Sequence, residues 1–243
     1  MRNHIPFFSK LILLLLLLSS IFINNSFAEQ RKSSRSMILI IGDGMDDHQI
    51  TIARNYLVGS RGTLLLDEMP FRGVAQVLTI DEVSGLPVYV ADSANTATAL
   101  ATGQVTSRGR IATSAGNDLD LPTIVEIASR EGYRTGLVTT SSITDATPAS
   151  FAAHVSSRYC ESPAAMIDIV KYGIELGSCT DDLKVSGGLG SISEQLAKSN
   201  VHLLLGGGRQ HFTANSEVSQ STAMQLATEN GFTIPSQHEH HSR

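Results

Sequence analysis

Residues 90–103 read Val-Ala-Asp-Ser-Ala-Asn-Thr-Ala-Thr-Ala-Leu-Ala-Thr-Gly, and they predict a helix that begins at Ser93. Alanine and leucine favour helices, and Asp92 is of a type that favours the position before the first turn. The N–H groups of a first turn have no partner inside the helix, so they bind anions readily. The Ser93 hydroxyl would lie among them, placed to attack an anionic substrate. The plainer interpretation is that Asp92 only caps the helix and that Ser93 is only polar helix surface.

A second stretch, residues 37–45, reads Met-Ile-Leu-Ile-Ile-Gly-Asp-Gly-Met. Its apolar run Met37–Ile41 predicts a strand that is buried on both faces, as in a parallel sheet, and the following glycines predict a sharp end. Asp43 would then stand at the carboxyl end of a strand, where open α/β sheets place their ligands. A carboxylate at such a point suits a hard or borderline cation. The alternative is an ordinary turn aspartate.

Strands and helices alternate along the chain, which predicts an α/β fold with a mostly parallel sheet between two layers of helices, a three-layer α/β/α sandwich. Residues 176–190 are rich in Gly, Ser and Asp and predict a surface loop. Nothing in the sequence marks a second domain. The expected strands are 36–41, 73–79, 135–140 and 201–205, and the expected helices are 47–58, 93–102, 121–131, 146–155, 163–175, 190–199 and 220–230.

The first 28 residues have the pattern of a signal peptide. Arg2 and Lys10 precede the apolar run Leu11–Ile23, and Ser26-Phe27-Ala28 forms a cleavage site. The run has 13 residues, fewer than the roughly 20 that span a bilayer. We therefore expect cleavage after Ala28, export to the periplasm or the extracellular space, and no stable membrane anchor afterwards. An uncleaved anchor is the alternative.

The composition of the chain limits its partners and its compartment. About 215 residues follow the predicted cleavage site, enough for one sizeable core. The net charge of −5 predicts no basic surface for nucleic acid. The two cysteines, Cys160 and Cys179, predict a disulfide, because an even count behind an export signal is typical of an oxidising compartment. Two buried thiols are the alternative.

The stretches around Asp43 and Ser93, in this order and at this distance, resemble alkaline phosphatases. Several motifs in order are far more specific than any one of them, and the resemblance covers residues 36–213. The further matching segments are Asp145-Ala146-Thr147-Pro148, His154-Val155-Ser156-Ser157-Arg158, Ile192–Leu196 and Leu205-Gly206-Gly207-Gly208.

The resemblance implies hydrolysis of phosphate monoesters through a phosphoserine at Ser93, with two zinc ions and one magnesium ion as cofactors. It implies that Arg158 binds the phosphate group and that Asp92 orients Arg158. It also makes a homodimer the common assembly, although no interface is legible in the sequence. Judged without the resemblance, Arg158 is an ordinary surface arginine after a helix.

The resemblance implies the metal ligands as well. Ser93 would bind zinc, and Asp43 would bridge zinc and magnesium. Asp145 and Thr147 would serve the magnesium. The same Asp145–Pro148 segment also reads as a helix start, with Asp or Thr as the cap and Pro in the first turn, and both interpretations can hold at once.

Two positions depart from the family pattern, and a third segment only resembles a family motif. Asp46 stands where the family usually has glycine, and an added carboxylate there would tighten or perturb metal binding. Asn95 stands where the family favours a smaller residue, and we expect it to crowd the turn behind Ser93. Asp47-His48 resembles a ligand pair by composition, but it lies too early for the family's zinc pair. We interpret it as the exposed first turn of a helix.

The family places a magnesium Glu and most zinc ligands in a later part of its sequence, and no histidine of this chain stands in such a motif. We therefore expect residues 29–243 to be the N-terminal portion of an alkaline phosphatase domain, incomplete as a fold and inactive alone. Two other functions stay open: a short exported protein that binds phosphate or metal without turnover, and a sulfatase or phosphodiesterase of the same superfamily. Asp92-Ser93-Ala94 disfavours a sulfatase. The closing His-Glu-His-His, 238–241, predicts a frayed tail that could bind a metal loosely.

Overall fold

The computed structural model describes residues 36–171, 173–215 and 221–235, and the chain divides into two units, Met1–Gly42 and Asp43–Arg243. The predicted signal peptide and the closing His-Glu-His-His lie outside the described residues. Within those three ranges, no helix is long and apolar enough to cross a bilayer.

The described part of the first unit, residues 36–42, contains neither helix nor strand, so the strand predicted over 36–41 is wrong. Met37, Ile38 and Ile40 are 80%, 84% and 87% exposed. An apolar run indicates a tendency toward burial, but it does not specify the neighbouring strand that must accept and donate its backbone hydrogen bonds.

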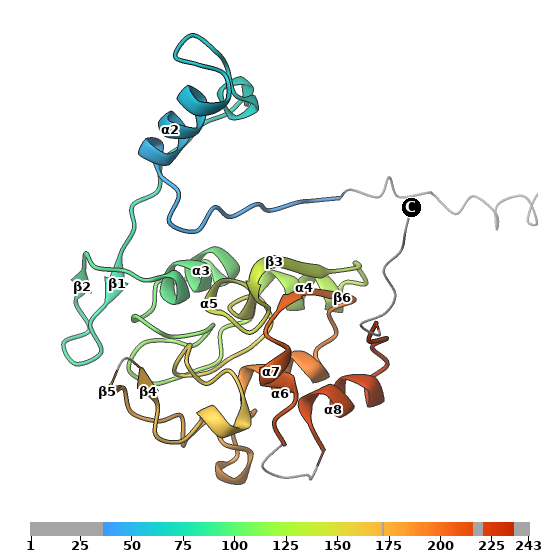
Figure 1. Cartoon of the computed structure of the whole chain (residues 1–243). Coiled ribbons are helices and arrows are strands. Elements are labelled where there is room, and N and C mark those ends of the chain that lie inside the picture. Colours follow the sequence, from blue (N-terminus) through green and yellow to red (C-terminus); the bar gives the residue numbers. More distant parts are fainter. Residues whose placement is uncertain (1–35, 172, 216–220, 236–243) are drawn as a thin grey trace, which may run out of the picture. The chain divides into compact units, whose positions relative to one another are not determined.

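The second unit is built around two parallel strands, β3 (Gly136–Ser142) and β6 (Leu203–Gly207). Figure 1 shows them side by side. Gly136 pairs with Leu203, and the register shifts before Ser142 pairs with Gly207. They confirm the strands predicted over 135–140 and 201–205, and with them the α/β class with a parallel sheet. Parallel strands end at the same edge, so the segments that follow Ser142 and Gly207 emerge together.

Five predicted helices of the second unit are confirmed to within a few residues. Each begins after a residue that caps it, because side chains such as those of Asp92 and Thr123 accept a hydrogen bond from a first-turn N–H. These helices are α2 (Asp47–Leu57), α3 (Ser93–Thr102), α4 (Ile124–Arg130), α6 (Ile192–Lys198) and α8 (Ala223–Glu229). In α4 the cap is Thr123, so Pro122 lies just before the helix and not in its first turn.

The helix predicted over 146–155 is much shorter, and α5 covers only Ala146–Ala149. Phe151 and Ala152 then donate to carbonyls three residues back, which tightens the chain, and Val155 pairs with Ile111. Val155 forms its backbone hydrogen bonds with Ile111 and not within a helix. A local sequence pattern does not reveal such a distant partner.

The helix predicted over 163–175 is wrong. A 3₁₀ turn, Pro163–Ala165, is followed by a hairpin of β4 (Val170–Lys171) and β5 (Ile174–Glu175). Gly173 has φ +75°, a conformation that glycine adopts without strain and that reverses the chain. The loop predicted over 176–190 is confirmed apart from a 3₁₀ turn, Lys184–Ser186.

Four other elements are short. The strand predicted over 73–79 reduces to β1 (Thr79–Ile80), which pairs antiparallel with β2 (Pro87–Val88). A 3₁₀ turn spans Leu65–Glu68, and α7 (Arg209–Phe212), which the sequence did not predict, follows β6 directly.

Helices α3 and α5 pack through small side chains. Ala94 of α3 and Ala146 and Ala149 of α5 are fully buried. The Ser150 hydroxyl, just after α5, donates to the Ala94 carbonyl at 3.3 Å, which shows how closely the two backbones approach. This packing places the start of α3 beside the segment that follows β3 (Figure 1).

Candidate functional site

The site begins at the start of α3, where Asp92 is the cap and Ser93 is the first helical residue. One Asp92 oxygen, Oδ1, accepts hydrogen bonds from the N–H groups of Asn95 and Gly109, both at 3.1 Å. The helix start predicted from the sequence is therefore confirmed. Ser93 is half-buried, and its hydroxyl lies at the end of a ten-residue helix.

Asn95 does not crowd this turn, contrary to expectation. Its side chain is fully buried, its Oδ1 accepts from the Asp92 N–H at 2.8 Å, and its Nδ2 donates to the Leu78 carbonyl at 2.9 Å. A smaller residue could not form these two bonds, so Asn95 completes a reciprocal cap that fixes the residue before Ser93.

Asp43 joins two hydroxyl-bearing segments. Its Oδ1 accepts from the Ser93 hydroxyl at 3.1 Å, and its Oδ2 accepts from the Thr147 hydroxyl at 3.0 Å. The carboxylate is exposed, and Gly44 follows it at φ +67° in the predicted turn. The structure thus brings together three of the predicted site residues, from positions 43, 93 and 147.

Arg158 lies between two carboxylates. Its Nη1 donates to Asp92 Oδ2 at 3.2 Å, and its Nη2 donates to Asp145 Oδ1 at 2.9 Å. The Arg158 side chain is only 21% exposed. Burial opposes its charge, but the hydrogen bonds and charges of Asp145 and Asp92 outweigh burial and raise the pKa of Arg158 above its ordinary value. The contact with Asp92 has the geometry expected of an orienting residue.

Asp145 is the cap of α5, as its pattern predicted, and Oδ1 also accepts from the Ala146 N–H at 2.7 Å. Its recorded contacts are therefore with Arg158 and with its own helix. They do not include Asp43, whereas Thr147, two residues further along in α5, does contact Asp43.

The oxygen atoms of Asp43, Ser93 and Thr147 form a donor set that suits a hard cation such as magnesium. Zinc sites usually use histidine or cysteine as well, and a catalytic zinc takes about three protein ligands. Among the described residues, no group of three His, Cys, Asp or Glu side chains could hold a metal ion. These residues therefore fit part of a magnesium site and do not fit two zinc ions.

The residues that departed from the family pattern near Asp43 serve α2. The Asp46 side chain accepts from the N–H groups of His48 and Gln49, at 2.8 and 3.3 Å, and so caps the helix. Asp47 and His48 form its exposed first turn, as predicted.

Two carboxylates near the site were missed by sequence reasoning. Glu161 accepts from the Thr144 hydroxyl at 2.6 Å and contacts His211 Nε2 at 3.1 Å. Asp182 accepts two hydrogen bonds from Ser156. Both contacts join residues that are 17 or more positions apart. No local motif marks them, and only the tertiary fold identifies these partners.

His154, in the segment that matched the family, is buried away from these contacts. Its Nδ1 lies 3.0 Å from the Ala112 carbonyl and its Nε2 lies 2.8 Å from Glu126. Burial disfavours the charged ring, but the bond to Glu126, the bond to the carbonyl and the charges of Glu126 and Asp120 raise the pKa of His154. With an acceptor at each ring nitrogen, the doubly protonated form satisfies both.

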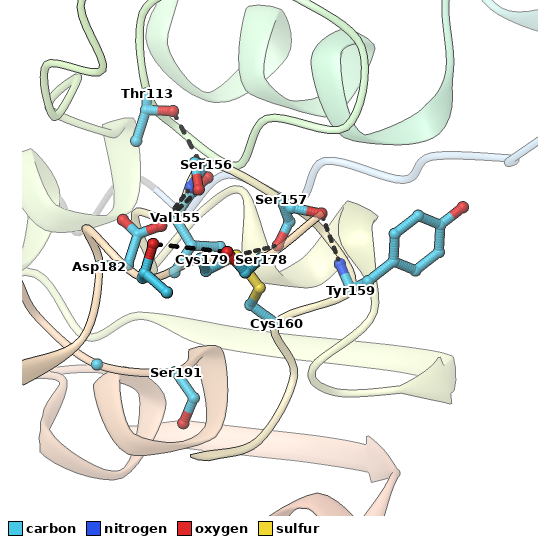
Figure 2. The surroundings of a disulfide bond; sticks show 12 residues. Thr113, Val155, Ser156, Ser157, Tyr159, Cys160, Ser178, Cys179, Asp182 and Ser191 are labelled. Carbon is cyan, nitrogen blue, oxygen red and sulfur yellow. Dashed lines mark hydrogen bonds between the residues drawn. A yellow bond between two sulfur atoms is a disulfide. The ribbon is translucent and has the colours of Figure 1, made fainter. Parts of the chain in front are cut away.

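The Cys160–Cys179 disulfide predicted from the sequence is present, with the two Cα atoms 6.5 Å apart. Figure 2 shows it below Ser157, close to Asp182. The helix expected between the two cysteines is replaced by the β4–β5 hairpin described above, so the bridge closes a loop and not a helical segment.

Comparison with known proteins agrees with this geometry. The family model for alkaline phosphatase matches residues 34–241. The chain is 46% identical over 179 residues to streptomycin-6-phosphate phosphatase of Streptomyces griseus, covering 74% of this chain and 37% of that protein. It is 38% identical over 190 residues to alkaline phosphatase of Escherichia coli K12, covering 78% and 38%.

Solved structures give the same result. The cold-active alkaline phosphatase of a psychrophilic Shewanella species matches with a TM-score of 0.60 and 27% identity, over 82% of this chain and 41% of that chain. The enzyme of the Antarctic bacterium TAB5 matches with a TM-score of 0.51 and 26% identity, over 76% and 43%. This chain thus spans about two fifths of the length of these relatives. With its fold, its ordered motifs and a family match over nearly all of its residues, the chain belongs to the alkaline phosphatase family.

Proposed function

We propose that this chain supplies the nucleophile and the phosphate-binding arginine of an alkaline phosphatase that hydrolyses phosphate monoesters through a phosphoserine at Ser93. The observation that carries the proposal is the convergence at Ser93. Its hydroxyl stands on the first turn of α3 with Asp43 as its hydrogen-bond acceptor, and Asp92, the adjacent cap, holds Arg158.

The proposed reaction has two displacements. The Ser93 oxygen attacks phosphorus, the bond to the ester oxygen breaks, and the alcohol leaves with a proton. Water then attacks the phosphoserine and releases inorganic phosphate and the free hydroxyl. Arg158 donates to the phosphoryl oxygens, and the first-turn N–H groups of α3 face the same charge. Asp92 and Asp145 keep the guanidinium oriented before the substrate arrives.

We propose one magnesium ion and two zinc ions as cofactors. Asp43, Asp145 and Thr147 would hold the magnesium, and the ion would supply positive charge that stabilises the phosphoryl group during transfer. A variant of the TAB5 enzyme has been solved with Mg bound in its M3 site. The described residues do not fit two zinc ions, so no step is assigned to zinc. Its ligands would come from outside the set described above.

We also propose that residues 1–28 are a cleaved signal peptide and that the rest, 29–243, belongs to one exported phosphatase domain. The disulfide supports an oxidising compartment. N-terminal sequencing of the secreted or periplasmic protein would begin at Glu29 if this is correct. Size-exclusion chromatography with light scattering would test the homodimer that the family implies.

The direct test of function is to trap the intermediate. The protein that carries this chain, isolated at its natural length from the cells that make it, is incubated with radiolabelled inorganic phosphate and quenched in acid. We expect label on the peptide that contains Ser93. Phosphate binding without a covalent label or turnover would instead support the alternative, an exported binding protein.

A substrate panel would define the leaving group. The relative at 46% identity is named a streptomycin-6-phosphate phosphatase, so phosphorylated aminoglycosides stand beside simple aryl phosphates as candidate substrates. Comparison of kcat/KM for the two classes would separate a broad monoesterase from one that selects its alcohol.

A further inference from the structure

The short segment that carries Arg158 is tied at both ends to the same turn. At one end, Cys160 forms the disulfide with Cys179. At the other end, the N–H and the hydroxyl of Ser156 both donate to one oxygen of Asp182, at 3.0 and 2.6 Å. Figure 2 shows the dashed hydrogen bonds from Ser156 to Asp182 and, lower in the view, Cys160 and Cys179.

The two ties are themselves connected. The Asp182 N–H donates to the Cys179 carbonyl at 3.1 Å, so residues 179–182 form one turn, and the Asp182 carbonyl accepts from the Gly190 N–H at 2.8 Å. Asp182 is 9% exposed and Cys179 is 1% exposed. A turn with two buried end residues and these internal bonds is a stiff support for the two residues that it holds, Ser156 and Cys160.

A third contact fixes Arg158 from the opposite side. The Arg158 N–H donates to the Gly109 carbonyl at 2.6 Å, and the Gly109 N–H donates to Asp92 Oδ1 at 3.1 Å. Asp92 in turn accepts from the Arg158 guanidinium. The backbone and the side chain of the arginine therefore share one support, and its position is set by the residues on either side of it.

A buried carboxylate is an unusual choice for a purely structural tie. Within the described parts of the chain, Asp182 forms no ion pair, and its recorded side-chain partner is Ser156. Burial opposes the charge of the Asp182 carboxylate. A shorter side chain at this position, such as serine, would not reach Ser156. At position 182, one carboxylate oxygen accepts two hydrogen bonds from Ser156, which lies two residues before Arg158.

We propose that Asp182 is a positioning residue for phosphate binding, which acts by holding Ser156 so that the Arg158 guanidinium keeps the orientation that phosphate requires. The inference rests on the proposed function, because it assumes that Arg158 binds phosphate. Asp182 itself touches neither the guanidinium nor Ser93 in the recorded contacts. It acts through the backbone of residues 156–158.

The test compares three variants of the natural-length protein, with inorganic phosphate as the probe. Asp182→Ala removes the acceptor, Asp182→Asn keeps an oxygen that can accept both bonds, and Asp181→Ala alters the exposed neighbour as a matched control. Calorimetric titration should show phosphate affinity reduced about tenfold in Asp182→Ala, about the effect of 1.4 kcal/mol. Affinity should be largely restored in Asp182→Asn and unchanged in Asp181→Ala. KM for an aryl phosphate should rise more than kcat falls.

Hydrogen exchange gives a second measurement that does not depend on catalysis. The amides of residues 156–160 should exchange faster in Asp182→Ala, while those at the start of α3 keep the wild-type rate. If Asp182→Ala fails to fold, Ser156→Ala removes one of the two bonds and should weaken phosphate binding about threefold.

Three results would overturn the proposal: wild-type phosphate affinity in Asp182→Ala with only a lower Tm, no rescue by Asp182→Asn, or unchanged exchange of residues 156–160. A wild-type protein that binds no phosphate would refute the proposed function instead. The exchange measurement would still decide whether Asp182 fixes the arginine segment.

Discussion

The surroundings of Arg158 and of Asp43 differ in how firmly hydrogen bonds hold each side chain. On the side that we propose binds phosphate, Arg158 is half-buried and bonded to two carboxylates, and Asp92 has partners for both oxygens. On the metal side, Asp43 is exposed and its recorded partners are two hydroxyls. The difference shows that protein hydrogen bonds fix the Arg158 guanidinium more firmly than they fix the Asp43 carboxylate. Asp43, which we propose as a metal ligand, is held by fewer protein hydrogen bonds than Asp92.

The largest effect is expected where the two sides meet. Ser93→Ala in the natural-length protein should lower phosphomonoesterase activity by on the order of 10³-fold or more, because the nucleophile is lost while the fold is kept. Steady-state assays with an aryl phosphate at alkaline pH measure it. Thr102→Ala, at the far end of the same helix, is the control, because its hydroxyl donates to the Thr98 carbonyl and accepts from the Gln104 N–H, both at that end of the helix. Turnover within a few-fold of wild type in Ser93→Ala would contradict the assignment.

The metal side can be tested by adding metals to the chain as printed. Residues 29–243, exported and supplied with excess zinc and magnesium, should show no turnover above background. Asp43, Ser93 and Thr147 are too few for centres that take about three protein ligands for each catalytic zinc. Without the metal, the barrier should rise by several kcal/mol. Bound metal is measured on the soluble fraction, and robust turnover with two zinc ions per chain would show that other residues complete the site.

The phosphate side can be tested through its arginine. Arg158→Ala should weaken inhibition by inorganic phosphate about 10- to 100-fold, since each charge-assisted hydrogen bond contributes about 1.5–3 kcal/mol. Arg158→Lys should fall between wild type and Arg158→Ala, because an ammonium group keeps the charge but loses the planar fork. Arg134→Ala, an arginine outside the site, serves as the control. Equal phosphate inhibition in all four proteins would remove Arg158 from the site.

The smallest effect concerns the packing beneath the site, at His154 and Glu126. The raised pKa of His154 adds stability below its ordinary value of 6.5, and this is lost as pH rises through the higher folded value. Burial works against the charge of Glu126, but its bonds to His154 and Thr123 lower its pKa, and that contribution is lost only as pH falls below 4.5. Stability should therefore decline from pH 5.5 to pH 9.

Urea unfolding across this range measures the decline. Glu126→Gln should flatten it, whereas Glu131→Gln, at the end of the same helix, should keep the wild-type slope. An equal slope in Glu126→Gln would assign the pH dependence to other groups.

Prediction from sequence succeeded where the physics is local. The Asp92 cap, the start of α3 at Ser93 and the cap at Asp145 depend on hydrogen bonds that span a few residues, and the structure has all three. The expected disulfide is also present, because it depends on cysteine count and compartment and not on a detailed path of the chain.

Prediction failed where a distant partner decides the outcome. The run Met37–Ile41 has the composition of a buried strand, yet composition does not supply a neighbouring strand. The helix expected over 163–175 gave way to a hairpin that turns at Gly173. Asp182 and Glu161 were missed for the same reason, since their partners lie 26 and 17 positions away.

The buried alanines Ala94 of α3 and Ala146 and Ala149 of α5 set the geometry of the site by being small. With Ala94 and Ala146 fully buried, the distance between the two backbones is as short as methyl groups allow. A bulkier residue at either position would act as a wedge that moves Ser93 away from Thr147 without touching a reacting atom. Alanines that carry no chemistry therefore control the distance between the α3 and α5 backbones. How well these positions tolerate larger residues measures how accurately that distance must be kept.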